Sequence, residues 1–149
     1  MTATTPIVGR LRCVSLGLAL LLLAGCSKPD GFLETYPANG TAHFKGKPME
    51  HAVVTFHPVD GESKAKHLQP HGTVDAEGRY SLWTYRFGDG APPGRYCVTI
   101  TWPNQPESRL GMPGYVGDTL NGQYRDAEKS KIERTVDESE GELAAIELP

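Results

Sequence analysis

The chain is poor in cysteine and has no excess of positive charge, and both shortages limit what it does. Three of its 149 residues are cysteine, and its formal net charge is −3. A basic surface of the kind that binds nucleic acid is therefore not expected. The motifs of phosphate-binding loops, nucleophile elbows and zinc-protease helices are also missing from the sequence. We therefore expect no nucleic-acid partner, no cofactor and no enzymatic activity.

Long apolar runs are missing too, with one short exception near the N-terminus. The run from Cys13 to Ala24 follows Arg10 and Arg12. It is shorter than the about 20 apolar residues that a membrane-spanning helix needs. A basic start and a short apolar centre are instead typical of a secretory signal. The run closes on Leu-Ala-Gly before Cys26, which is the order of a bacterial lipobox. We therefore expect cleavage before Cys26 and lipidation of this residue.

Lipidation of Cys26 predicts both the organisation and the location of the chain. Residues 1–25 are the lipoprotein signal peptide, 26–35 are the lipidated cysteine and a polar tether, and 36–149 are one domain. Several acyl chains anchor firmly, because each buried CH₂ contributes about 0.8 kcal/mol. We expect a protein of the bacterial cell envelope, attached to a membrane by lipid outside the cytoplasm. Ser27 after the cysteine favours the outer membrane over the inner one. The alternative is an ordinary cleaved signal with a chance cysteine.

The rest of the chain predicts an all-β fold. Short alternating runs are separated by Gly, Pro, Asp and Asn, and no stretch keeps a helical period. Alternation puts Ala52, Val54 and Phe56 on one face, and it points Tyr96, Val98, Ile100 and Trp102 toward the core. About seven strands with this spacing predict a Greek-key β-sandwich. The expected strands are 41–44, 51–57, 72–74, 79–85, 95–102, 131–136 and 142–148.

Four segments in this order resemble the carboxypeptidase regulatory-like domain, a transthyretin-like (prealbumin-like) β-sandwich. They are 40–42, 46–56, 73–82 and 93–100, and the resemblance covers about Tyr36 to Trp102. It implies a transthyretin-like fold in a small exported lipoprotein that carries this domain alone. It implies no chemistry, because the zinc module of true carboxypeptidases and the tail of the related hydrolase are both absent. His51 stands where the family usually has glycine, so the turn before the second strand is expected to differ.

Two groups of side chains are candidates for ligand binding. Trp83 and Tyr85 alternate with inward-facing Tyr80 and Leu82, which places them outside, next to Arg86. Exposed aromatic and arginine side chains are enriched where proteins hold partners. This pattern predicts a non-enzymatic binding or assembly module for a protein or a glycan of the envelope. In the alternative, the long segment 104–129 folds over Trp83 and Tyr85 and buries them.

The histidines suggest a second function. All five lie between His43 and His71, and His51 and His57 are expected on one face of a strand. Imidazoles gathered near a strand end bind Zn²⁺ or Cu²⁺. The alternative prediction is therefore a metal-binding envelope protein that uses His57 and His71, with His51 and His67 nearby. Solvated surface histidines are the simpler explanation of the same pattern.

Overall fold

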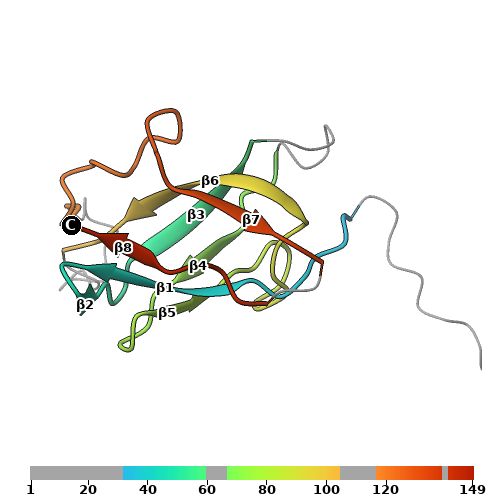
Figure 1. Cartoon of the computed structure of the whole chain (residues 1–149), viewed down its shortest axis with the longest axis horizontal. Coiled ribbons are helices and arrows are strands. Elements are labelled where there is room, and N and C mark those ends of the chain that lie inside the picture. Colours follow the sequence, from blue (N-terminus) through green and yellow to red (C-terminus); the bar gives the residue numbers. More distant parts are fainter. Residues whose placement is uncertain (1–31, 60–66, 105–116, 139–140) are drawn as a thin grey trace, which may run out of the picture. The chain divides into compact units, whose positions relative to one another are not determined.

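We describe a computed structural model of the chain, in which residues 32–59, 67–104, 117–138 and 141–149 are placed (Figure 1). Their contacts group Leu33–Pro149 into one compact unit. The predicted signal peptide and Cys26 lie outside the described residues. No helix that is long and apolar enough to cross a bilayer is found in the placed segments.

The unit is built from two four-stranded sheets. In the first, β1 (Asn39–Phe44) pairs with β2 (Lys47–Pro48) and β5 (Arg79–Ser81). β8 (Ile146–Leu148) pairs with β1 in parallel, whereas all other strand pairs are antiparallel. The second sheet has the order β4-β3-β6-β7. Its strands are β4 (His71–Thr73), β3 (Val53–Pro58), β6 (Gly94–Thr101) and β7 (Glu133–Val136).

The core lies between the two sheets and follows the alternation of the strands. Ala52, Val54 and Phe56 are all buried, as the sequence pattern predicts. The ring of Phe56 packs against Tyr80 of the first sheet, with centroids 6.4 Å apart, and against Tyr96 of its own sheet at 5.7 Å. Apolar side chains on one face of each strand therefore explain why the two sheets stack.

The predicted all-β sandwich is confirmed, and the placed residues contain eight strands where about seven were expected. The additional strand is β2, a two-residue return after the turn at Lys45 and Gly46, whose φ angles are both positive. The expected strand 79–85 is shorter, because β5 ends at Ser81. Trp102 was expected in the core; it is half-buried and packs against the edge of the core.

His51 is not part of a strand, which corrects the prediction that it shares a face with His57. It lies in the turn before β3 with a φ of 68°. Its backbone N–H donates to Val74 O at 2.9 Å, and the N–H of Ala52 donates to Met49 O at 2.9 Å. These bonds hold the chain in a left-handed conformation that suits glycine better than histidine. His51, which stands where the family usually has glycine, is therefore a strained residue.

One arginine joins the two sheets along the side where β7 faces the segment before β8. The guanidinium of Arg134, on the inner face of β7, donates to Ala144 O at 2.8 Å and to Ala145 O at 2.6 Å. Charge-assisted bonds to carbonyls are stronger than neutral ones. The arginine therefore closes a side of the sandwich along which no strand pairing is found in the placed residues.

Candidate functional site

The segment after β5 crosses from one sheet to the other and carries the predicted aromatic residues. Trp83 pairs with His71 through two backbone bonds, Trp83 N to His71 O at 2.9 Å and His71 N to Trp83 O at 3.1 Å. Their rings are also in contact, with centroids 3.9 Å apart. Trp83 is therefore half-buried and helps to connect β4 with the first sheet.

The next residues, 84–89, form a loop that we call the Phe87 loop. The carboxylate of Asp89 accepts the backbone N–H groups of Thr84, Tyr85 and Arg86 at 2.7, 3.0 and 2.9 Å. The hydroxyl of Thr84 donates to Gly90 O at 2.6 Å. One carboxylate thus replaces the sheet bonds that the backbone loses where β5 ends.

The end of the Phe87 loop is fixed by close contact with the N-terminal part of the domain. Gly90 has a φ of 81°, and a Cβ at this position would lie 1.8 Å from Tyr36 O. Only glycine fits such an approach of two backbones. The adjacent Ala91 exchanges two backbone bonds with Tyr36, at 2.9 and 3.0 Å. The loop is therefore held at both of its ends.

The three residues expected at a ligand surface differ in exposure. Tyr80 and Leu82 point inward as predicted, and both are buried. Tyr85 is half-buried, and its hydroxyl accepts the backbone N–H of Leu33 at 3.1 Å. Arg86 is exposed. The alternative, in which segment 104–129 covers the aromatic residues, falls in part on residues 105–116, which lie outside the described part of the chain.

Among the residues that the structure describes, the most exposed aromatic one was not singled out by the sequence pattern. Phe87, at the tip of the loop, is 93% exposed. The sequence Phe-Gly-Asp-Gly reads as an ordinary turn, so the role of Asp89 and the exposure of Phe87 were both missed. The only local signal that could have indicated the exposure of Phe87 is its place inside a turn, between a cation and a glycine.

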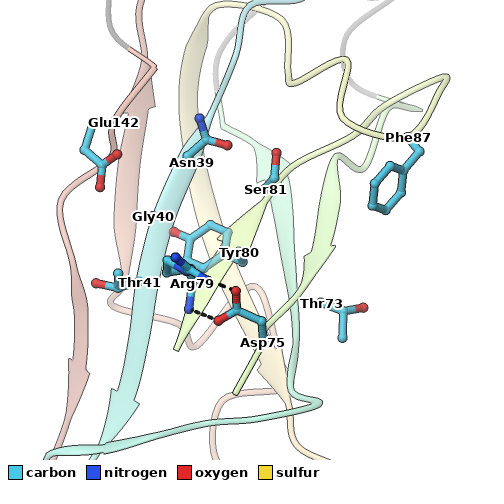
Figure 2. Close-up of a pocket in the computed structure, with 10 residues that line it drawn as sticks. All are labelled: Asn39, Gly40, Thr41, Thr73, Asp75, Arg79, Tyr80, Ser81, Phe87 and Glu142. Atoms are coloured by element: carbon cyan, nitrogen blue, oxygen red, sulfur yellow. Dashed lines mark hydrogen bonds and ion pairs between the residues drawn. The ribbon is translucent and has the colours of Figure 1, made fainter. Parts of the chain in front are cut away.

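A groove of about 430 Å³ lies on the solvent face of β1 and β5, within the volume range of ligand sites (Figure 2). Strand register places Asn39 beside Ser81 and Thr41 beside Arg79. In Figure 2, Phe87 and Glu142 lie on opposite sides of these strands. The residues with hydroxyl, amide or charged groups at the groove are Asn39, Thr41, Thr73, Asp75, Arg79, Ser81 and Glu142, and Gly40, Tyr80 and Phe87 complete its lining.

The charged end of the groove is an ordered ion pair. The guanidinium of Arg79 donates to Asp75 at 3.1 Å and to Glu77 at 3.1 Å. The backbone N–H of Arg79 lowers the pKa of Asp75, and the Arg79 guanidinium lowers it further. Asp75 also accepts the backbone N–H of Glu77, as expected for this turn. The pair is exposed, so it adds little to stability.

Beneath the groove lies a polar atom without a partner among the described residues. Tyr80 is 3% exposed, and its hydroxyl makes no hydrogen bond there. A Cβ on Gly40 would lie 2.6 Å from this hydroxyl, so glycine is what allows the ring to fit. Burial raises the pKa of Tyr80 to about 12. The hydroxyl is covered by the protein, so it belongs to the core rather than to the groove.

The structure gives each of the two metal-site histidines a partner of its own. His57 Nε2 lies 2.9 Å from Thr99 Oγ1, and burial lowers the pKa of His57. His71 Nδ1 lies 3.0 Å from Gln69 O. In the segments that the structure describes, no three histidine, cysteine or acidic side chains are placed to hold a metal ion. His67 is exposed at the edge of these segments.

The free thiol on β6 is occupied by a contact inside the domain. Cys97 is half-buried, and its thiol donates to Ala127 O at 3.1 Å. This contact fits a small packed side chain.

Comparisons of the chain with family models, curated proteins and solved structures give no match. The resemblance to the carboxypeptidase regulatory-like domain therefore stays a prediction, and the argument for function depends on the site itself.

Proposed function

We propose that this chain is a lipid-anchored, non-enzymatic module of a bacterial cell envelope that binds a protein or glycan partner through the groove on β1 and β5. The observation that carries the proposal is the groove itself, with hydrogen-bonding side chains in register on two strands. The lipobox at Cys26 supports the anchor, and the resemblance to a carboxypeptidase regulatory-like domain supports a binding role. The outer membrane is the favoured location, because Ser27 follows the cysteine.

The lining favours a partner that is rich in hydroxyl or peptide groups. Asn39, Thr41 and Ser81 offer both donors and acceptors, and the Asp75–Arg79 pair adds one charge of each sign. Such groups fix the orientation of a bound partner. The metal-binding alternative has no matching observation, because no three histidine, cysteine or acidic side chains in the described residues are placed to hold a metal ion.

The proposal is tested by photo-crosslinking in cells that express the full chain. A photoreactive amino acid replaces Ser81, which is exposed in the groove, and Thr135, which is exposed on β7, is the matched control. We expect an adduct from position 81 and none from position 135. Treating the adduct with protease or with glycosidase distinguishes a protein from a glycan. Equal adducts at both positions, or none at position 81, would contradict the proposal.

A further inference from the structure

The chain enters the domain directly beside the Phe87 loop. The backbone N–H of Leu33 donates to the hydroxyl of Tyr85, and Tyr36 is paired with Ala91. In Figure 1, the first described residues approach the end of the sandwich at which β1 begins. The loop and the entry point are therefore at the same end of the domain.

Only a short stretch of chain separates this entry point from the predicted lipid. Cys26 precedes Leu33 by seven residues. A fully extended chain covers at most about 3.5 Å per residue, so the tether reaches no more than about 25 Å. Acyl chains on Cys26 would thus keep this end of the domain close to the bilayer surface.

The same end exposes apolar side chains next to a cation. Phe87 stands at the tip of the loop, and Val59 is 48% exposed. The N–H of Val59 donates to Arg95 O, near the start of β6, which is the strand that follows the Phe87 loop in the chain. Arg86 is exposed beside Phe87. Apolar rings that enter the acyl boundary, with arginines at the level of the phosphates, are typical of segments lying on membranes.

The Phe87 loop already has a fixed conformation in the absence of a membrane. Asp89 fixes three backbone N–H groups, so the tip keeps one conformation while its ring stays in water. A rigid loop loses little conformational entropy when it binds. Because Phe87 is 93% exposed, its ring is available for contact with a surface outside the domain.

We propose that the Phe87 loop rests on the phospholipid surface, with Phe87 entering the interface and Arg86 facing lipid phosphates. This inference depends on the proposed lipid anchor at Cys26. It places one end of the sandwich on the membrane and leaves the β1–β5 face at the side of the domain, open to a partner.

The test uses the full lipidated chain, purified from membranes and placed in phosphatidylethanolamine–phosphatidylglycerol vesicles that contain brominated lipid. Phe87→Trp puts a fluorophore at the tip, and Lys47→Trp, on β2 at the opposite end, is the matched control. Fluorescence of the unsubstituted chain, which contains Trp83 and Trp102, is subtracted. We expect brominated lipid to reduce the added fluorescence about twofold at position 87 and to leave it unchanged at position 47.

Two further measurements separate failure of this inference from failure of the anchor. Intact mass reports whether Cys26 carries acyl chains, and a thermal melt checks that both variants are folded. An acylated chain whose position 87 is quenched by acrylamide in water, and not by brominated lipid, would overturn the lipid contact and leave the loop free for a protein partner. A chain without acyl groups would overturn the anchor and this inference together.

Discussion

Two loops at opposite ends of the sandwich are each organised by one aspartate, but only one of them exposes an apolar side chain. At the entry end, Asp89 accepts three backbone N–H groups from residues 84–86. At the other end, Asp118 accepts the N–H groups of Trp102, Leu120 and Gly122 at 2.9, 3.1 and 2.9 Å. Both carboxylates are half-buried. A single aspartate thus organises each loop, because an ionised carboxylate accepts several bonds at once.

The two loops differ in where they place their apolar side chains. The Asp118 loop places Leu120 in the core and holds Trp102, whose indole N–H donates to Glu50 O at 2.8 Å. The Phe87 loop instead places Phe87 in solvent. The first loop therefore serves folding, and the second holds an apolar side chain available for something outside the domain. Loops that expose such groups on a rigid support are where binding residues concentrate.

The largest expected effect is one that both ends share, the loss of stability at alkaline pH. Burial raises the pKa of both Tyr80 and Tyr96 from 10 to about 12. The folded protein thus holds each phenolic proton more tightly than the unfolded chain does. Each contribution is complete below pH 10 and is lost as the pH rises to about 12, at about 3 kcal/mol per tyrosine.

This alkaline transition is measured by denaturant unfolding between pH 9 and about pH 12. Trp83 reports on the entry end and Trp102 on the other, so each is followed in a variant in which the other tryptophan is phenylalanine. We expect the two probes to change together, because one core supports both ends. Tyr80→Phe removes an unpartnered hydroxyl and is expected to flatten part of the pH dependence. Separate transitions at the two ends would contradict a shared core.

Removing the carboxylate of the folding loop is expected to have the next largest effect. Asp118→Ala leaves three half-buried N–H groups without their acceptor and loosens Leu120, so we expect a loss of about 3 kcal/mol. Urea unfolding measures it, with Asp118→Asn as a milder control that keeps one acceptor oxygen. A loss no larger than that of Asp89→Ala would remove the proposed difference between the loops.

Removing the carboxylate of the Phe87 loop is expected to lower the free energy of unfolding by less than removing that of Asp118. In Asp89→Ala the freed N–H groups lie nearer to solvent, so we expect a loss of about 2 kcal/mol. A larger effect is expected when Asp89→Ala is combined with Phe87→Trp in brominated vesicles. Because the tip of the loop is no longer fixed, the tryptophan at position 87 should lose most of its quenching by brominated lipid. If quenching stays unchanged in the double variant, then the rigidity of the loop has no part in membrane contact.

The smallest predicted change is a gain in stability at the end opposite the entry point. His51 adopts a positive φ, and glycine does so without strain. His51→Gly is therefore expected to stabilise the domain by about 1 kcal/mol, measured by the same urea unfolding. The exposed Glu50→Gly, one residue earlier in the chain, is the control and should not stabilise. No gain from His51→Gly would show that the side chain compensates for its backbone.

The parts of this fold that follow from neighbouring residues were predictable. Alternation indicated the correct inward face for Val54 and Phe56, because it depends only on neighbouring residues of one strand. Asp118 was not recognised, since it accepts an N–H from Trp102, sixteen residues away. The groove was missed for the same reason, because its lining runs from Asn39 to Glu142 and exists only once the strands are paired.

The lipid anchor is tested most directly by the intact mass and N-terminal residue of the full chain recovered from bacterial membranes. We expect a polypeptide that begins at Cys26 and carries a diacylglyceryl group on its thiol, with a further acyl chain on its amine. A chain that begins at another residue, or an unmodified Cys26, would contradict the anchor, and with it the membrane contact of the Phe87 loop.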